Sequence, residues 1–306
     1  MNPQIIIPVA KKNIDILKKN IFYIKKYLNP VNIYVLTAEN NFSDFEDLKN
    51  EIVVLDENAI IQGITFETIS KIISKTSIPP KRTGWYFQQF LKMFWCFSSF
   101  CSDYYTVWDA DTIPLKSIEL FSNDFKPYIH YKTEHHVAYF ETIEKLLNMK
   151  KKVDYSFISE KMTFSKKIMQ ELLNEISQAE ILGNSIIEKI IFAASSSSNE
   201  LGFSEFETYG TYISYKYPAL YQLQNLKSYR NAARYIGMNP NKFDIALLGR
   251  FFDTASFEKW DNPKKWFIPF YKIIAFLSYP LNQLFRPKYK DIKHSARTKS
   301  DITKLH

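Results

Sequence analysis

The hydrophobic positions in the first part of the chain alternate between continuous runs and helical spacings. Residues 4–9 (QIIIPV) form a continuous apolar run, typical of a strand that is buried on both faces of a parallel sheet. Apolar side chains then recur three and four positions apart over residues 14–28, which predicts a helix with one buried face. Asn13 stands where it would cap this helix.

Two further apolar runs, residues 32–37 and 51–55, predict two more strands. An opening of this kind implies an α/β fold with a parallel sheet. Because open α/β sheets bind ligands beyond the carboxyl ends of their strands, we expect a ligand near residues 8–10, 37–39 and 56–58.

Residues 84–100 (GWYFQQFLKMFWCFSSF) are apolar almost all round, which predicts a buried helix. The polar exceptions are Gln88, Gln89 and Lys92, and Gln88 and Lys92 share one face because they are four positions apart. A buried amide or ammonium group is costly without partners. These side chains therefore either meet carbonyl and carboxylate groups of the protein or line a ligand pocket.

A predicted strand over residues 104–108 (YYTVW) is followed directly by Asp109-Ala110-Asp111. Extended backbone directs Asp109 and Asp111 to the same side, where two carboxylates repel unless a cation lies between them. A divalent cation shared with substrate phosphates would satisfy both. The alternative is a turn in which the two Asp residues cap a helix near Lys116.

The middle of the chain predicts a further strand of the sheet at residues 127–131 (PYIHY). Helices are predicted over residues 137–149, 164–178 and 180–194. The segment that leads into the first of these helices contains Glu134, His135, His136 and Tyr139. A His here is either a metal ligand or phosphate contact, or an ordinary surface or core residue.

Acidic and aromatic side chains alternate in residues 203–218 (FSEFETYGTYISYKYP), which we interpret as extended backbone leading into a strand. Glu205 and Glu207 would then point the same way among aromatic rings. Desolvation raises the pKa of a carboxyl group and favours general acid–base chemistry. The alternative is a solvated strand edge.

Composition removes several classes of protein. Only 7 of the 306 residues are Gly, and no glycine-rich phosphate-loop pattern occurs. Cys96 and Cys101 form neither a disulfide framework nor a zinc spacing, which favours a reducing cytoplasm. The net charge of +8 is uneven, because residues 286–306 contribute +5 from seven Lys or Arg and two Asp. A nucleic-acid-binding protein would more often spread basic charge over a recognition face.

An aromatic segment precedes this basic tail. Residues 266–285 are apolar, but Pro269, Lys272 and Pro280 interrupt them, so the segment is a poor candidate to cross a membrane. We therefore expect a catalytic domain over residues 1–250 and an amphipathic, basic extension over residues 251–306 that docks on a membrane surface. The alternative is that these aromatic side chains pack on the domain as ordinary core.

Four blocks in this order resemble a known family. They are IIIPV (5–9), GWYFQQFLKM (84–93), VWDADTIP (107–114) and FSEFETYG (203–210). Over about residues 3–235 the chain is similar to a family of bacterial glycosyltransferase-like proteins. That family has the nucleotide-diphospho-sugar transferase (GT-A type) fold, a Rossmann-type mixed sheet flanked by helices. His136, Tyr139 and SFISEKMTF (156–164) also fit the family pattern, which has His where this chain has Lys161.

The resemblance implies a metal-dependent transfer of a sugar from a nucleotide donor. Pro8, Val9 and Asp56 would hold the base and ribose. Asp109 and Asp111 would hold Mn²⁺ or Mg²⁺ on the diphosphate and so neutralise the leaving group.

The other candidate side chains of the site follow from the same resemblance and, for Gln88 and Lys92, from their being the polar exceptions on a buried helix. Gln88, Lys92 and His136 would belong to the donor pocket, and Lys92 could add to the neutralisation of the diphosphate. Glu205 or Glu207 would face the acceptor. One of them would deprotonate the acceptor hydroxyl in an inverting enzyme, whereas a retaining enzyme needs neither as a base.

The expected function is therefore that of a hexosyltransferase-like enzyme that builds a surface polysaccharide. Its acceptor would be a glycan or a lipid-linked glycan, and it would lie in the cytoplasm on the inner face of the cytoplasmic membrane, without a nucleic-acid partner. Two alternatives stay open. One is a metal-dependent phospho- or nucleotidyltransferase that uses the same Asp pair, and the other is a basic, non-enzymatic adaptor for nucleic acid or anionic lipid.

Overall fold

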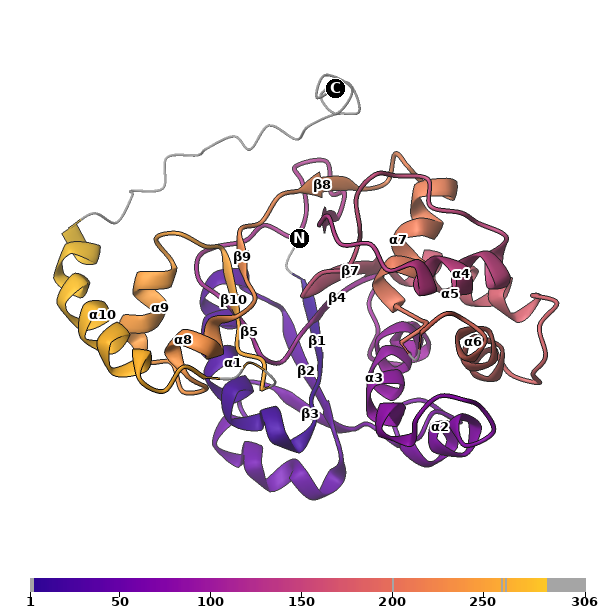
Figure 1. Cartoon of the computed structure of the whole chain (residues 1–306), viewed down its shortest axis with the longest axis horizontal. Helices are drawn as coiled ribbons and strands as arrows, with labels where there is room; N and C mark the ends of the chain where they lie inside the picture. The colour runs from indigo at the N-terminus through magenta and orange to yellow at the C-terminus, as the bar shows by residue number, and fades with distance from the viewer. Residues whose placement is uncertain (1–2, 200, 260, 262, 285–306) are drawn as a thin grey trace.

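The computed structural model describes residues 3–199, 201–259, 261 and 263–284, and its central feature is a five-stranded mixed sheet (Figure 1). The strand order is β3-β2-β1-β4-β7, with β7 antiparallel to β4 and the other neighbours parallel. The strands are β1 (Gln4–Pro8), β2 (Asn32–Thr37), β3 (Val53–Asp56), β4 (Tyr104–Trp108) and β7 (Lys161–Ser165). The predicted α/β class, a mixed sheet flanked by helices, is confirmed.

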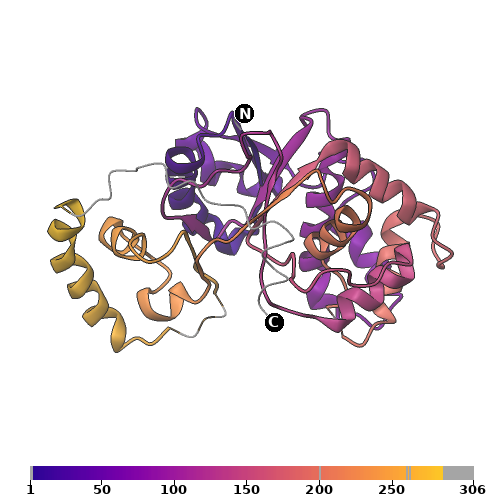
Figure 2. The ribbon, with the colours of Figure 1, turned by 90° about the horizontal axis from the view of Figure 1, so that it is seen from above.

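Alternate side chains of the central strands enter two different cores. Ile5 and Ile7 of β1 pack with one face of α1 (Ile14–Leu28), whereas Ile6 points to the opposite side of the sheet. On that side lie the helices α2 (Phe66–Ile73), α3 (Thr83–Phe94), α4 (Val137–Leu147), α5 (Lys166–Ser177), α6 (Ile186–Ser195) and α7 (Glu205–Lys216). Figure 2 shows the two layers on either side of the sheet. This burial on both faces explains the continuous apolar run of β1.

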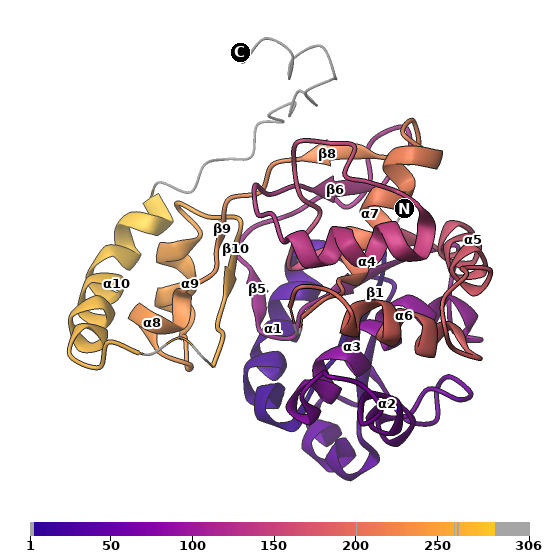
Figure 3. The ribbon, with the colours of Figure 1, turned by 45° about the vertical axis from the view of Figure 1, so that its right-hand side comes forward.

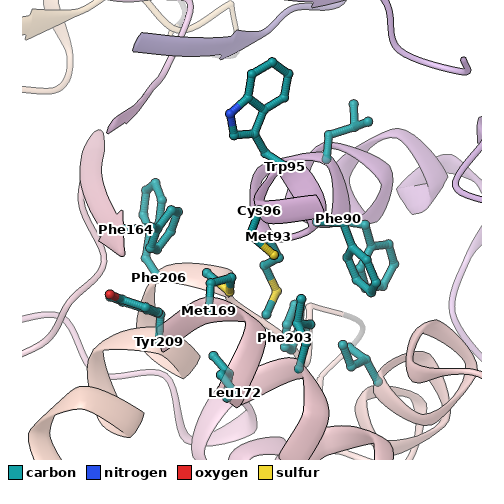
Figure 4. Packing of buried hydrophobic residues seen from close by; sticks show 14 of the residues in the cluster. Phe90, Met93, Trp95, Cys96, Phe164, Met169, Leu172, Phe203, Phe206 and Tyr209 are labelled. Atoms are coloured by element: carbon teal, nitrogen blue, oxygen red, sulfur yellow. The ribbon is translucent and has the colours of Figure 1, made fainter. Parts of the chain in front are cut away.

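The core on the Ile6 side of the sheet joins α3 to elements that follow it in sequence. Phe90 and Met93 of α3 lie with Phe164 of β7 and with Phe206 and Tyr209 of α7 in one buried cluster (Figure 4). The rings of Phe164 and Tyr209 meet edge to face, with centroids 4.7 Å apart. This cluster fixes α7 against α3, and the two helices carry the candidate residues Gln88, Lys92, Glu205 and Glu207.

Two small sheets accompany the central sheet. One has the order β5-β10-β9, and the other pairs β6 with β8. Their strands are β5 (Thr112–Pro114), β6 (Tyr128–His130), β8 (Gln222–Gln224), β9 (Ser228–Tyr229) and β10 (Thr254–Ser256). The prediction that residues 127–131 continue the central sheet is wrong, because β6 pairs with β8 while β7 takes the place beside β4.

Several predicted boundaries shift. The helix at residues 14–28 and the strands at 32–37 and 104–108 are confirmed to the residue. Asn13 stands at the N-cap of α1 but makes no capping hydrogen bond with its side chain. The helix predicted to start at residue 180 begins only after Ser185, whose side chain accepts a hydrogen bond from the Glu188 amide. The helix predicted over residues 84–100 ends at Phe94 and continues as the 3₁₀ helix η4 (Trp95–Phe97).

The last helices form the outer edge of the molecule (Figure 3). They are α8 (Ala232–Ile236), α9 (Lys242–Leu248) and α10 (Phe267–Leu284). Among the described residues, no helix is both long enough and apolar enough to cross a membrane. The basic segment from Arg286 onward lies outside the described residues.

Candidate functional site

The two aspartates lie in the turn that joins β4 to β5. The amide of Asp109 donates to the Glu160 carbonyl (3.0 Å), and the Thr112 amide donates to the Asp109 carbonyl (3.1 Å). The chain then enters β5 at Thr112, so no helix forms near Lys116 and the alternative of a helix cap there is wrong. The pair stands beyond the carboxyl end of a central strand, which is the position predicted from the sequence.

Lys92 places a buried ammonium group between two carboxylates. Its Nζ lies 3.1 Å from Asp109 Oδ1 and 2.8 Å from Glu205 Oε1. It also lies 4.7 Å from the centre of the Phe206 ring. Burial alone would lower the pKa of Lys92, but Asp109 and Glu205 outweigh it and raise the pKa above its usual range. Lys92 is therefore a fixed cation that meets carboxylates of the protein.

Asp111 has a different electrostatic environment from Asp109. Among the described residues it forms no ion pair. Burial, with smaller contributions from Asp109 and Glu258, raises the pKa of Asp111 to about 7. Burial also raises the pKa of Asp109, although Lys92 opposes this. The turn thus contains more half-buried negative charge than Lys92 alone compensates.

This uncompensated carboxylate fits a divalent cation. Mg²⁺ or Mn²⁺ is commonly held by one or two carboxylates together with water and substrate phosphates. In the part of the chain that the structure describes, no cluster of three or more His, Cys, Asp or Glu forms a metal site. Asp109 and Asp111 would therefore be the protein's share of the ligands, and the donor's phosphates would complete the set.

Most of residues 203–218 is helical rather than extended, since α7 covers Glu205–Lys216, so the predicted strand is wrong. The Ser204 side chain accepts a hydrogen bond from the Glu207 amide and starts α7. Each helical residue turns by about 100°, so Glu205 and Glu207 point in different directions instead of sharing a side. The apolar residues Phe206, Tyr209 and Ile213 stand three and four apart, and this was the helical signal in the sequence.

Glu205 faces α3. Its carboxylate contacts Lys92, and its amide donates to Gln89 Oε1 (3.0 Å). Gln89 is buried, and its Nε2 has no hydrogen-bond partner among the described residues. Gln88, which the sequence favoured for the pocket, is half-buried and makes no hydrogen bond or ion pair with a described residue. The neighbouring Gln89 is thus the glutamine that joins the two helices.

Glu207 faces the segment that leads into β7. Its Oε2 accepts hydrogen bonds from Ser156 Oγ (2.7 Å) and from the Phe157 amide (3.2 Å). Its Oε1 is buried and has no hydrogen-bond partner among the described residues. Burial raises the pKa of Glu207, although the bonds from Ser156 and Phe157 lower it in part. Of the two glutamates, Glu207 is therefore the one that forms no ion pair with a described residue.

The same helix approaches Phe157 closely at Gly210. A Cβ atom at this position would lie 2.0 Å from Cγ of the Phe157 ring. Gly210 therefore lets the ring pack against the backbone of α7, one turn beyond Glu207. This close approach explains why a glycine follows the acidic residues in the FSEFETYG block.

A second charged network, which the sequence interpretation missed, adjoins the aspartates. Glu160 Oε1 lies 3.2 Å from Lys132 Nζ and 3.6 Å from Arg230 Nε. Glu160 Oε2 accepts a hydrogen bond from Ser228 Oγ (3.2 Å). Arg230 also pairs with Glu134 and lies 3.8 Å from Glu258. The only local signal was a charged pair, Glu160-Lys161, directly before an apolar strand. The partners lie far apart in the chain, and their meeting depends on β9 and β10.

Lys161 is buried at the start of β7. It pairs with Trp108 of β4 in the strand register, and its Nζ donates to Gln224 Oε1 (3.3 Å). Burial lowers the pKa of Lys161 to about 7, although Glu160 opposes this. In the sheet, Lys161 is therefore paired with the residue that directly precedes Asp109. The ammonium group of Lys92 contacts two carboxylates, whereas that of Lys161 donates to an amide oxygen.

The remaining predicted site residues lie at other positions. Pro8 ends β1, and the Val9 amide donates to the Leu36 carbonyl. Asp56 ends β3, and its Oδ1 accepts from the Asn58 amide (3.1 Å). These three residues share the carboxyl edge of the sheet with Asp109.

His136 stands at the N-terminus of α4. The centroid of its ring lies 5.1 Å from the centroid of the Tyr139 ring, and its Nε2 lies 3.6 Å from Glu134 Oε2. His136 thus approaches the Arg230 network through Glu134, and its described contacts do not include the Asp pair.

Comparisons with known proteins give low similarity throughout. The mouse xyloside xylosyltransferase 1 structure is 9% identical, with 86% of this chain and 99% of that chain covered and a TM-score of 0.42. The galactosyltransferase LgtC, bound to donor and acceptor sugar analogues, is 11% identical, with 90% and 95% covered and a TM-score of 0.42. The glycosyltransferase GlyE of Streptococcus pneumoniae is 10% identical, with 92% and 62% covered and a TM-score of 0.42.

Similarity at this level identifies no activity or substrate. A search of curated protein sequences gave no significant match. The model of one protein family, described as a family of unknown function (DUF6492), matches residues 4–265.

Proposed function

The chain belongs to the DUF6492 family, and we propose that it is a metal-dependent, hexosyltransferase-like glycosyltransferase. It would move a sugar from a nucleotide-sugar donor to a glycan or lipid-linked acceptor in surface polysaccharide synthesis. The observation that carries this proposal is the position of Lys92 between Asp109 and Glu205, with Asp111 two residues beyond. These groups combine a fixed cation with a carboxylate that has no ion pair with a described residue, at the edge where an α/β sheet binds its ligand.

Asp109 and Asp111 would hold the Mn²⁺ or Mg²⁺ ion. When bound, the metal would neutralise the negative charge that develops on the leaving diphosphate. The raised pKa of Asp111 supports this assignment, because a partly desolvated carboxylate that has no ion pair with a described residue gains most from a nearby cation.

The other residues of the edge would bind and orient the donor. Lys92 is held in place by its two carboxylate contacts, so its ammonium group would approach the sugar or diphosphate in one orientation. Pro8, Val9 and Asp56 would contact the base and ribose from the neighbouring strand ends. Gln88 and His136 are proposed for the outer part of the donor pocket.

The two glutamates of α7 receive different roles. Glu205 would position Lys92, because its carboxylate contacts the ammonium group directly. Glu207 is the proposed acid–base group on the acceptor side, because its pKa is raised and one of its oxygens has no hydrogen-bond partner among the described residues.

The proposed location is the cytoplasm, on the inner face of the cytoplasmic membrane, where a lipid-linked acceptor is available. Two cysteines without a disulfide agree with a reducing compartment.

Product analysis tests this function. The full chain is incubated with Mn²⁺ and a panel of nucleotide sugars, and the nucleotide products are separated by chromatography. Sugar transfer, or its hydrolytic side reaction, releases a nucleoside diphosphate. A parallel incubation supplies nucleoside triphosphates and sugar phosphates instead; release of pyrophosphate there, without sugar transfer in the first assay, would identify a nucleotidyltransferase and contradict the proposal.

A further inference from the structure

Helix α10 lies at the outer edge of the molecule, with α8 and α9 between it and the central sheet (Figures 1 and 3). Its inner side packs on these two helices. Ala275 is fully buried there. The ring of Phe267 meets that of Tyr235 in α8 edge to face, with the ring centroids 5.6 Å apart. The Phe276 ring meets that of Phe243 in the same way at 5.2 Å. The helix is therefore fixed to the domain by one of its faces.

The charged residue of α10 lies on this inner face. Lys272 forms an ion pair with Asp244, whose side chain is fully buried in α9, and its Nζ lies 3.4 Å from the Asn239 carbonyl oxygen. Asp244 also closes the capping box of α9 with Asn241. The contact with Lys272 thus ties α10 to the start of α9.

The opposite face of α10 and the residue before it present large apolar side chains to solvent. The exposed fractions are 77% for Trp266, 58% for Phe270, 58% for Ile273, 41% for Ile274 and 66% for Leu277. These five side chains, here called the outer face, recur three and four positions apart and so form one stripe. A helix in contact with water on this side would have the reverse arrangement, with its charge outside and its apolar residues inside.

The charges around the outer face indicate what covers it. Helix α10 contains no Asp or Glu, and Lys264 and Lys265 precede it. Residues 286–306, which begin two positions after the helix ends, carry seven Lys or Arg and two Asp. A second copy of the chain on the outer face would bring two basic segments together. An anionic surface would instead attract them, and Trp and Phe side chains suit the boundary between headgroups and acyl chains.

We propose that the outer face of α10 inserts into the headgroup region of a bilayer that contains anionic phospholipid, with residues 286–306 adding electrostatic attraction. This inference specifies the surface responsible for the membrane location in the proposed function. It does not require sugar transfer to be correct, because α10 lies apart from the Asp pair and its binding is measured without any substrate.

Vesicle flotation tests this proposal. The full chain is mixed with vesicles of phosphatidylcholine alone or with one third phosphatidylglycerol. We expect binding to the anionic vesicles to be at least tenfold tighter than to the neutral ones. The triple variant Trp266→Ser, Phe270→Ser and Leu277→Ser should lose at least tenfold in affinity. It should keep its fold by circular dichroism, because all three side chains are exposed.

The matched control changes two exposed apolar residues outside α10, Phe97→Ser and Leu182→Ser, and should bind like the wild type. A third variant replaces Lys288, Lys290, Lys293 and Arg297 with Gln and should bind the anionic vesicles at least tenfold less tightly. Unchanged binding of the Trp266 triple variant, or no binding of the wild type to either vesicle, would overturn the proposal. So would a wild-type dimer that the triple variant converts to a monomer while vesicle binding is absent.

Discussion

The ammonium nitrogen of Lys92 lies 2.8 Å from Oε1 of Glu205, although the two residues are 113 positions apart in the chain. One belongs to α3 and the other to the first turn of α7, and both side chains are buried. The second carboxylate that Lys92 contacts belongs to Asp109, which directly follows β4. Two helices and a strand thus meet at one cation.

Lys92→Met should destabilise the fold and weaken donor binding. The substitution leaves the buried Glu205 carboxylate unpaired, for which a loss of about 3 kcal/mol in the free energy of unfolding is expected. The double variant Lys92→Met, Glu205→Gln should recover part of this loss, because no unpaired charge remains. Urea denaturation measures both. A single variant that is as stable as the wild type, with unchanged donor affinity, would contradict a role for this cation.

Gln substitutions at Glu205 and Glu207 should have different effects. Glu205→Gln removes one of the two charges that hold Lys92 and should weaken nucleotide-sugar binding by roughly tenfold. Glu207→Gln keeps an acceptor for Ser156 and Phe157, so donor affinity should stay while turnover falls by about 100-fold or more. Calorimetric titration and steady-state kinetics separate the two effects. Equal losses of affinity and turnover in Glu207→Gln would identify a structural carboxylate instead.

Gly210→Ala should destabilise the protein, because the new methyl group would overlap the Phe157 ring. We expect a loss of about 1–3 kcal/mol in the free energy of unfolding. Gly84→Ala is the matched control, since Gly84 is also helical and, within 4 Å, its Cβ would meet one atom of the described residues, Phe66 Cε2 at 3.9 Å. The control should be neutral or more stable by up to about 1 kcal/mol. Similar effects of both substitutions in urea denaturation would exclude the close contact as the cause.

Lys161 gives a prediction about pH. Its pKa is lowered to about 7 by burial, so between pH 7 and 10.5 the unfolded state binds more protons at this residue than the folded state does. The contribution of Lys161 to stability therefore rises with pH, by at most about 1.4 kcal/mol per pH unit in this window.

Lys161→Met lacks this dependence. The stability of the variant relative to the wild type should therefore be highest near pH 7 and decline toward pH 9. Urea denaturation of both proteins at pH 7, 8 and 9 checks this. A stability difference that stays constant with pH would show that the ammonium group of Lys161 is not desolvated.

The sequence predicted the elements whose form depends on local burial. Strand β4 and helix α1 have apolar patterns that only one kind of element satisfies, so their bounds were found to the residue. The Asp pair was placed correctly because its position follows from β4 alone. The sequence also identified Lys92, since an ammonium group on a buried helix requires a partner.

The elements that the sequence missed depend on distant partners. Helix α7 is buried all round near its start, so its acidic and aromatic residues alternate by chance with the period of a strand. Strand β6 is apolar like a central strand, but the edge position beside β4 belongs to β7. The Glu160–Arg230 contact joins residues 70 positions apart and depends on β9, a strand of two residues.

The central claim is that the Asp109–Asp111 turn and Lys92 form a metal-dependent site for a nucleotide sugar. Its most direct test is calorimetric titration of a panel of nucleotide sugars into the full chain, with and without Mn²⁺, for the wild type and for Asp111→Asn. We predict that at least one nucleotide sugar binds the wild type at least tenfold more tightly with Mn²⁺, and that this gain disappears in Asp111→Asn. If no nucleotide sugar binds the wild type, or if Asp111→Asn keeps the full effect of Mn²⁺, the site has been assigned wrongly.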